Sequence, residues 1–529
     1  MVKLSEIKNY LKNNSSNYIE YFEKGRRCTK KYCEVHDDVM KVVSFIRSKG
    51  IEQRDRIGII GSNTYEWLLV DLACVVGGWI SVSFHERNFE NEIDKLEADH
   101  NLKLLFLDEK YLTKAEGTNC VSLNSIKEVI QNHDMATGES ASFLDEEIFT
   151  VIFTSGTTGF PKALSIKVVG VDSFINETNK LLKFKDDDKI IIFLPMSVFT
   201  CKAYIYGAIS LGFNIVLANI DNFTIALKKS QPTIMQGVPY LFETIHDTFY
   251  NVIKDSKIKL LFVKLFFLLC DKELIPEAIK SKIQAAFFKD FINFWGGKMR
   301  LMLTGSAPIS AKVLRFYRNM GVNLYEAYAT NEAGLICINY PGKTRIGSVG
   351  TPFSNRKIKI SPEGEILVED GLFAFKYESE SDEFNSKIFR DDGYIATGDM
   401  GHFDKDGFLY IEGRIKDVIT LGNGEKVLPG FLENMLKESP YIKQAMVYGD
   451  NKPFLSCIIT RMNDSVTEEM IRKEIDSINL KVTEVNRIKE FVFTKEPFSI
   501  DNGQLNSNLK MNRSVISKAY ENELNKIYV

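Results

Sequence analysis

Proline, tryptophan and histidine are scarce in this sequence of 529 residues, with 13, 3 and 6 copies respectively. The low proline count and the 34 glycines exclude a collagen-like chain, and 44% hydrophobic residues exclude a disordered one. Internal repeats and low-complexity tracts are also lacking. These absences indicate a soluble globular protein with a sizeable core, built from about three or four domain-sized units.

An excess of positive charge is lacking as well. Lysine and arginine total 67 against 70 aspartates and glutamates, giving a formal net charge of -3. Without a basic field we expect no nucleic-acid partner. The eight cysteines form no CxxC pair and have no histidine at zinc-ligand spacing. We therefore predict reduced core thiols in a cytoplasmic protein, and the dispersed histidines receive no catalytic role.

Long hydrophobic runs are missing. The longest apolar stretch, Leu260 to Cys270, is interrupted by Lys264 and is far shorter than the roughly 20 residues of a spanning helix. We expect a buried helix there, with a monotopic membrane contact or an acyl-chain wall as the alternative, so any membrane contact is at most weak. Residues 1–25 carry frequent charges, and we expect a helix rather than a secretion signal.

From residue 50 the chain alternates short apolar runs with helical patterns, a βαβ rhythm that predicts parallel strands with helices on their faces. Strands are expected at 56–61, 79–84, 102–108, 146–156, 189–195, 213–218, 232–237, 299–305 and 322–328, and helices at 63–78 and 88–101. Beyond about residue 340, residues 357–369 and 401–414 are typical of antiparallel hairpins. We predict an α/β protein whose active site gathers at strand carboxyl ends.

The predicted strand at 146–156 runs into Thr154-Ser155-Gly156-Thr157-Thr158-Gly159-Phe160-Pro161-Lys162. Four hydroxyls, two glycines and a lysine within nine residues can direct N–H groups, O–H groups and one cation towards a polyphosphate. The segment is no Walker loop, because Pro161 replaces the second spaced glycine and Ala163 the final Ser or Thr. A solvated turn is the structural alternative.

Residues Phe153 to Lys162 resemble the signature loop of the adenylate-forming superfamily, which contains acyl-CoA synthetases, peptide-synthetase adenylation domains and luciferases. The resemblance implies a large N-terminal domain of mixed, mainly parallel sheets layered with helices plus a β-barrel-like subdomain, and a small mobile α+β C-terminal domain. It also implies that the loop binds ATP phosphates through Thr154, Ser155, Gly156, Thr157, Thr158, Gly159 and Lys162.

Two further motifs follow in the family's order. Residues 303–308, Leu-Thr-Gly-Ser-Ala-Pro, are similar to the turn at the adenine and acyl pocket, which implicates Ser306 and Ala307. Residues 325–332 resemble the segment that contacts adenine, phosphate and Mg²⁺. The resemblance implies nucleotide-binding roles for Glu326, Ala327, Tyr328 and Asn331, which replaces the usual threonine, and makes Glu332 a catalytic residue and metal ligand.

The C-terminal motifs complete the resemblance. Residues 392–399 resemble the DGW-x-x-TGD element, in which Asp399 would accept the ribose hydroxyls. Arg414 would reach ribose or phosphate, and Lys416 would be the hinge between domains 1–415 and 417–529. Residues 502–513 are similar to the loop of the catalytic lysine, for which Lys510 is the candidate.

The resemblance implies a two-step ligase. A carboxylic acid and Mg·ATP would form an acyl-adenylate, and a pantetheine thiol would then displace AMP. A leucine before Lys510 favours medium- or long-chain fatty acids, with coenzyme A or the phosphopantetheine of an acyl carrier protein on another chain as the acceptor.

Val198 stands where the family usually has histidine beside the acyl pocket. This departure, together with Asn331, leaves an impaired nucleotide or acyl binder as an alternative. A luciferase-type oxygenase is a third possibility that no residue favours.

Overall fold

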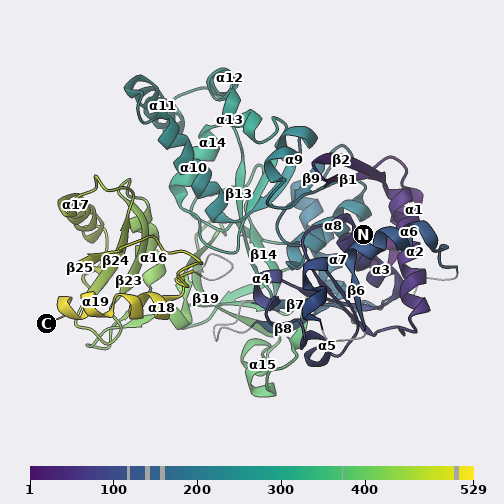
Figure 1. Cartoon of the computed structure of the whole chain (residues 1–529). Coiled ribbons are helices and arrows are strands. Elements are labelled where there is room, and N and C mark those ends of the chain that lie inside the picture. The colour runs from purple at the N-terminus through teal and green to yellow at the C-terminus, as the bar shows by residue number, and fades with distance from the viewer. Residues whose placement is uncertain (116–118, 138–142, 155–160, 372, 506–510, 529) are drawn as a thin grey trace.

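The computed structural model describes residues 1–115, 119–137, 143–154, 161–371, 373–505 and 511–528. Two large mixed sheets and their helices form the main body, and a smaller body that begins near residue 419 lies at its side (Figure 1).

The largest sheet has nine strands in the order β15-β14-β13-β12-β11-β9-β10-β1-β2. The strands from β13 to β1 pair in parallel, and the outer strands β15, β14 and β2 pair antiparallel. In sheet order, the strands are β15 (Thr351–Pro352), β14 (Gly334–Ile338), β13 (Leu324–Thr330), β12 (Leu301–Thr304), β11 (Ile234–Gly237), β9 (Lys189–Ile192), β10 (Asn214–Leu217), β1 (Tyr18–Glu23) and β2 (Arg26–Lys31).

The second sheet has seven strands in the order β18-β8-β7-β4-β3-β5-β6. Its strands from β7 to β6 are parallel, whereas β8 and β18 are antiparallel. In sheet order, the strands are β18 (Ala374–Tyr377), β8 (Lys162–Lys167), β7 (Ile148–Thr154), β4 (Ile80–Phe84), β3 (Arg56–Ile60), β5 (Leu102–Leu107) and β6 (Cys120–Ser122).

The central strands of both large sheets are buried on both faces, because successive side chains point to opposite faces and an apolar cluster lies on each. On β9, Ile190 and Ile192 join an apolar cluster that spans the two sheets, whereas Ile191 joins a different cluster on the opposite face. On β5, Phe106 faces the shared cluster and Leu105 faces away from it. Continuous apolar runs in the sequence therefore become strands with no solvent-facing side.

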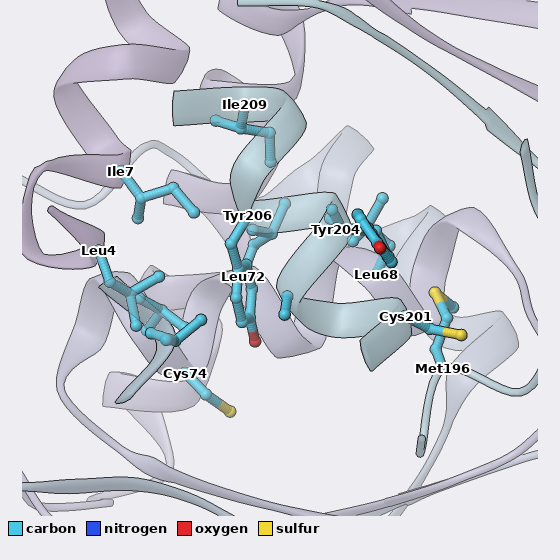
Figure 2. Packing of buried hydrophobic residues seen from close by; sticks show 14 of the residues in the cluster. Leu4, Ile7, Leu68, Leu72, Cys74, Met196, Cys201, Tyr204, Tyr206 and Ile209 are labelled. Atoms are coloured by element: carbon cyan, nitrogen blue, oxygen red, sulfur yellow. The ribbon is translucent and has the colours of Figure 1, made fainter. Parts of the chain in front are cut away.

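Helices α3 (Tyr65–Gly77), α7 (Val168–Leu182) and α8 (Phe199–Leu211) contribute to the cluster between the sheets. Every residue of α3 is buried, which accounts for an apolar character around the whole helix. Figure 2 shows side chains of α3 and α8, among them Leu72 and Tyr206, gathered in this cluster.

The remaining helices of the main body lie around the two large sheets (Figure 1). An apolar cluster on the far side of the nine-stranded sheet includes residues of α9, α10, α11, α13 and α14. These helices, with α12, are α9 (Phe223–Ser230), α10 (Pro239–Ile253), α11 (Lys257–Asp271), α12 (Glu277–Phe287), α13 (Lys289–Phe294) and α14 (Ala311–Asn319). The others are α1 (Ile7–Asn13), α2 (Tyr32–Ser48), α4 (Glu86–Phe89), α5 (Leu96–Asp99), α6 (Ile126–Asn132) and α15 (Asp382–Ile388).

Three helix predictions need correction. In the region 1–25, where a helix is expected, α1 ends at Asn13 and residues 18–23 form the strand β1. The single helix expected at 88–101 is two short helices, α4 and α5; Asn91 and Asp94, which belong to types that disfavour helix interiors, lie between them. The apolar helix expected to be buried, α11, is buried on one side only, because Leu261 and Leu268 are at least half exposed. No helix of the described residues is long and apolar enough to cross a membrane.

A four-stranded antiparallel sheet, β16-β17-β19-β20, occupies the place of the expected barrel-like subdomain. It contains both predicted hairpins. Its apolar face packs with residues of β13 and β14, so it adjoins the edge of the nine-stranded sheet. The strands are β16 (Ile358–Ile360), β17 (Glu365–Glu369), β19 (Tyr394–Phe403) and β20 (Leu409–Arg414).

The C-terminal body has its own core. Two apolar clusters contain only residues from Ile419 onward, and they lie on opposite faces of β23, since Val447 belongs to one and Met446 to the other. Its elements are β21 (Ile419–Thr420), β22 (Lys426–Val427), α16 (Pro429–Lys437), β23 (Ile442–Tyr448), β24 (Leu455–Arg461), α17 (Glu468–Asn479), β25 (Ile488–Phe493), α18 (Arg513–Ala519) and α19 (Glu521–Ile527).

A fully buried lysine ties α8 to α3 and to the seven-stranded sheet. The Nζ atom of Lys202 lies 2.7 Å from a carboxylate oxygen of Asp71 and donates to the hydroxyls of Ser81 and Thr150, both at 2.8 Å. The hydroxyl of Tyr206 donates to the other oxygen of Asp71 at 2.5 Å. Because the charge is paired and hydrogen-bonded, its burial is tolerated, whereas removal of one partner would leave an uncompensated charge.

We expect Lys202→Met to lower the free energy of unfolding by about 3–5 kcal/mol, because Asp71 would remain buried without its cation. Urea-induced unfolding of the main body measures the loss. The double variant Lys202→Met with Asp71→Asn should recover part of it, since it removes both charges. An unchanged unfolding midpoint for Lys202→Met would contradict this account.

Candidate active site

The ribose-binding candidate Asp399 lies where the nine-stranded and four-stranded sheets meet. The hydroxyl of Tyr328, on β13, donates to Oδ2 of Asp399 at 2.7 Å, and Nε of Arg414, on β20, lies 3.3 Å from Oδ1. Burial, with the nearby charge of Asp399, holds the pKa of Tyr328 well above its ordinary value. Tyr328 is therefore a neutral hydrogen-bond donor that orients this carboxylate.

A tyrosine that the sequence motifs did not identify links the predicted metal ligand to the phosphate loop. The hydroxyl of Tyr377, at the end of β18, donates to Oε1 of Glu332 at 2.5 Å. The side chain of Thr154, the first residue of the loop motif, lies close enough to Tyr377 to act on the pKa of its hydroxyl. Burial, and next the charge of Glu332, raise the pKa of Tyr377, so that its proton stays available to Glu332.

Lys162, the lysine of the phosphate-loop motif, already has an anionic partner. Its Nζ atom lies 2.9 Å from Oε1 of Glu380 and 3.9 Å from the ring centre of Phe384. Both side chains of the ion pair are partly shielded, with exposed fractions of 18% and 26%. The pairing of β7 with β8 places Lys162 opposite Thr154. Glu380 therefore forms an ion pair with Lys162, the cation that we predict to contact a phosphate.

The predicted adenine turn packs directly against β13. A Cβ atom on Gly305 would lie 2.8 Å from the carbonyl oxygen of Ala327, so this approach requires glycine. Ser306 has a φ of 71°, a left-handed conformation that costs energy in a residue other than glycine. Ala307 follows in the same turn, which therefore meets β13 through close backbone contact.

Glu326 is a buried carboxyl beside this turn. Burial raises its pKa to about 8, and a hydrogen bond from the backbone N–H of Ile309 opposes that rise only in part. At neutral pH the group is therefore predominantly protonated and can donate a hydrogen bond as well as accept one.

The proposed pivot lies directly after the ribose-site arginine. Lys416 is in a short 3₁₀ helix, Ile415–Asp417, between the four-stranded sheet and the C-terminal body. Burial, and next the charge of Arg414, lower the pKa of Lys416.

Contacts of described residues connect most of the predicted nucleotide site. Lys162 pairs across a β-ladder with Thr154, and Tyr377 lies near Thr154 and donates to Glu332. Glu332 follows β13, whose Tyr328 donates to Asp399. Asn331 is exposed beside Glu332. The predicted residues Ser155, Gly156, Thr157, Thr158, Gly159 and Lys510 lie outside the described residues.

Sequence reasoning missed Tyr377, Glu380 and Phe384. No motif spacing marks them, and they reach the site because β18 pairs with β8, more than 200 residues earlier in the chain. Only the sheet topology could have identified them.

The donor set fits a magnesium ion that is shared with substrate phosphates. Among the described residues, no group of three or more His, Cys, Asp or Glu side chains could enclose a metal by itself. Glu332 offers one carboxylate, which accepts a hydrogen bond from Tyr377. Mg²⁺ commonly binds one or two carboxylates together with substrate phosphates, so a single glutamate meets its requirement.

The sequence of this chain matches two family models. Residues 12–371 match the AMP-binding enzyme family, and residues 416–529 match the AMP-binding enzyme C-terminal domain. The first match covers well over half of the chain. The chain belongs to the AMP-binding enzyme family.

Similar curated proteins include Long-chain-fatty-acid--CoA ligase FadD15 of Mycobacterium tuberculosis, 26% identical over 91% of this chain and 89% of that protein. Long-chain-fatty-acid--CoA ligase 5 of Rattus norvegicus is 27% identical over 94% of this chain and 84% of that protein.

Solved structures share the fold. The anthranilate CoA ligase AuaEII in complex with anthranoyl-AMP superimposes with a TM-score of 0.79 at 18% identity, covering 98% of this chain and 97% of that one. ATP-bound MatB from Rhodopseudomonas palustris gives 0.76 at 19% identity, with 98% and 99% covered. The predicted α/β fold, with a large N-terminal and a small C-terminal domain, is confirmed.

These matches also confirm the predicted class of enzyme. The chain is an adenylate-forming acyl-CoA ligase, an AMP-forming acid–thiol ligase. ATP binding and the use of coenzyme A are typical of this family.

We expect the buried carboxyl of Glu326 to make stability depend on pH. Its pKa is about 8 in the folded protein and near 4.5 in the unfolded chain, so the folded state binds more protons between these values. The unfolding free energy should therefore fall as pH rises from about 5 to 8. Glu326→Gln cannot ionise and should remove this decline, by up to about 3 kcal/mol between pH 5.5 and 8.

Thermal or urea unfolding of parent and variant at several pH values measures this difference. The variant should match the parent near pH 5 and exceed it at pH 8. Parallel pH profiles for the two proteins would show that Glu326 ionises normally.

Proposed function

We propose that this chain activates a medium- or long-chain fatty acid with Mg·ATP and transfers the acyl group to coenzyme A. A carboxylate oxygen of the acid attacks the α-phosphorus of ATP and pyrophosphate leaves. The thiol sulfur then attacks the acyl carbon, its proton is lost, and AMP leaves. The long-chain fatty acid ligases among the relatives support the choice of acid.

The observation that carries the proposal is the chain of contacts that joins Lys162, Glu332 and Asp399 through Thr154, Tyr377 and Tyr328. It joins a cation, a metal-binding carboxylate and a ribose-binding carboxylate from segments that are far apart in sequence. A nucleoside triphosphate needs these three groups together.

In the proposed site Asp399 accepts hydrogen bonds from the ribose hydroxyls, and Arg414 reaches the ribose or the α-phosphate. Tyr328 holds Asp399 in position and flanks the adenine. The turn residues Ser306 and Ala307 and the adjacent β13 residues Glu326 and Ala327 line the same pocket. Because Asp399 and Tyr328 are buried and already hydrogen-bonded to each other, binding need not order them, which favours in-line attack.

The phosphates would contact the hydroxyls and N–H groups of residues 154–159, Lys162 and Asn331. Glu332 would hold Mg²⁺, which when bound neutralises phosphate charge. Tyr377 keeps the Glu332 carboxylate directed by donating to one of its oxygens, so that the other can face a ligand.

Lys510 is proposed to bridge the substrate carboxylate and the α-phosphate. Two like charges about 4 Å apart repel each other, and a positive group between them lowers that cost. Domain 417–529 carries this lysine, and rotation about Lys416 relative to domain 1–415 would replace it with a thiol-facing surface for the second step. The separate core of the C-terminal body supports such a rotation.

Two alternatives remain in view. The acceptor could be the phosphopantetheine of an acyl carrier protein instead of coenzyme A. An impaired binder is suggested by Val198, which is 38% exposed at the start of α8, and by Asn331. Activity with and without each acceptor separates the three possibilities.

We expect fatty-acid-dependent exchange of labelled pyrophosphate into ATP, and Lys510→Ala should lower its rate at least about 100-fold. Thioester formation from a supplied acyl-adenylate should fall much less, because that step does not bring the two anions together. Lys518→Ala, an exposed lysine on α18, is the matched control and should retain the parent rate.

An impaired binder would show no exchange with any acid, and Lys510→Ala would then change nothing. Exchange with short or aromatic acids alone would support ligase activity but contradict the proposed fatty-acid substrate. If a thioester forms only when a carrier protein replaces coenzyme A, coenzyme A is not the acceptor.

A second prediction concerns the ion pair between Lys162 and Glu380. We expect Glu380→Gln to tighten ATP binding about 1.4- to fivefold, because the phosphates would no longer compete with a carboxylate whose partly exposed ion pair with Lys162 contributes ~0.2–1 kcal/mol. Calorimetric titration with ATP measures the change. Glu383→Gln removes an exposed pair with Lys387 on the nearby helix α15 and should have no effect.

A weaker affinity for ATP in Glu380→Gln would show instead that Glu380 positions Lys162 for phosphate. In that case the competition described above would be wrong.

A further inference from the structure

Helix α11 carries apolar side chains on two opposite faces. Val263, Phe266 and Cys270 point into the cluster on the nine-stranded sheet. The opposite face has what we call the α11 stripe, whose four members are spaced by three or four residues and are each at least half exposed. They are Ile258 at 84%, Leu261 at 68%, Leu265 at 52% and Leu268 at 50%.

The exposed apolar surface continues onto α12. The ring of Phe262 on α11 lies 4.8 Å from the ring of Phe287, which is 66% exposed. Ile279 on α12 and Leu274 in the connection are also more than half exposed. Figure 1 shows both helices at the outer edge of the molecule, beyond α10 and α14. A contiguous patch of this kind on a soluble surface marks an interaction site.

Lysines border the α11 stripe. Lys257 precedes Leu261 by four residues, and Lys264 follows Leu261 by three and precedes Leu268 by four, so both lie beside the stripe on the helix surface. In this segment the ion pairs among described residues join Lys280 to Glu277 and Asp271 to Arg318 on α14. Neither pair involves Lys257 or Lys264, so both ammonium groups are available to an external anion.

The charge of this region is opposite to that of the chain. Residues 252–289 contain eight lysines and four carboxylates, whereas the whole chain has a formal net charge of -3. The region therefore presents a local positive field around an apolar centre. Negatively charged lipid headgroups attract lysines placed next to a surface in this manner.

The composition argues against a protein partner. Interfaces between proteins favour tyrosine, tryptophan, phenylalanine, methionine and arginine and are poor in lysine. Of these favoured types, residues 252–289 contain only phenylalanine, and they are rich in lysine, leucine and isoleucine. A lysine beside an apolar surface can keep its ammonium among headgroups while its stem lies along the hydrocarbon boundary.

We propose that the α11 stripe and the adjoining face of α12 dock on the surface of a lipid bilayer that contains anionic phospholipids. The leucines and isoleucine enter the boundary between headgroups and acyl chains, and Lys257 and Lys264 contact lipid phosphates. The contact is peripheral, since α11 has 15 residues and no described helix can span a membrane. It concerns a surface outside the nucleotide site and does not depend on which acid is activated.

Sedimentation of the full chain with vesicles tests this inference without any measurement of activity. The protein should pellet with phosphatidylcholine vesicles that contain phosphatidylglycerol, and less with phosphatidylcholine alone. Leu261→Gln with Leu265→Gln should weaken binding to the mixed vesicles about tenfold or more, because two apolar side chains no longer enter the bilayer.

Lys257→Gln with Lys264→Gln should weaken binding about tenfold or more to the mixed vesicles only, and the difference should shrink at high salt. The matched control is Leu480→Gln with Lys481→Gln, an exposed leucine and lysine on the C-terminal body, which should bind as the parent does. Equal thermal midpoints would show that all variants fold.

Absence of pelleting with either vesicle, or equal binding by the parent and the leucine variant, would overturn the proposal. Sedimentation equilibrium without lipid gives a further outcome. A dimer that the leucine substitutions dissociate would assign the patch to a second copy of this chain and would also overturn it.

Discussion

Burial of strands on both faces is the constraint from which the rest of this structure follows. Ile190, Ile191 and Ile192 are successive residues of β9, yet all three are removed from water, because clusters lie on either side of the sheet. Helices must therefore cover both faces, and the functional groups are left at strand ends and in turns. Thr154, Tyr328 and Tyr377 each lie at or near such an end.

Two ion pairs hold charged groups inside the protein. Lys202 with Asp71 is fully buried in the main body, and Arg513 with Glu433 is partly buried in the C-terminal body. Both pairs have additional hydrogen bonds. Arg513 begins the helix that follows the segment of the candidate lysine, so its two bonds to Glu433 anchor one end of that segment. Such pairs favour one arrangement of the elements because other arrangements would leave charges unpaired.

The proposed nucleotide site and the α11 stripe are distinct parts of one molecule. The first is built from polar groups that hold one another before any substrate arrives, as in the contact of Tyr377 with Glu332. The second is an apolar surface for which the fold supplies no internal partner. Membership of the AMP-binding enzyme family is consistent with the proposed nucleotide site, whereas it does not explain the α11 stripe.

Much of this protein is determined locally in its sequence. The apolar runs predicted the strands β3, β4, β5, β9 and β12, and the turn residues predicted both hairpins of the four-stranded sheet, because side-chain alternation and turn chemistry act over a few neighbours. The motifs also indicated the enzyme class, since phosphate binding requires a particular set of groups within a short loop.

Tertiary structure decided the rest. The contacts of Tyr377 and Glu380 with the site depend on the pairing of β18 with β8, which no local pattern encodes. Residue type alone could not show which side of α11 would be buried, because apolar residues occur on both. Local chemistry specifies elements and motifs, but partners that are distant in sequence meet only when the sheets and their covering helices assemble.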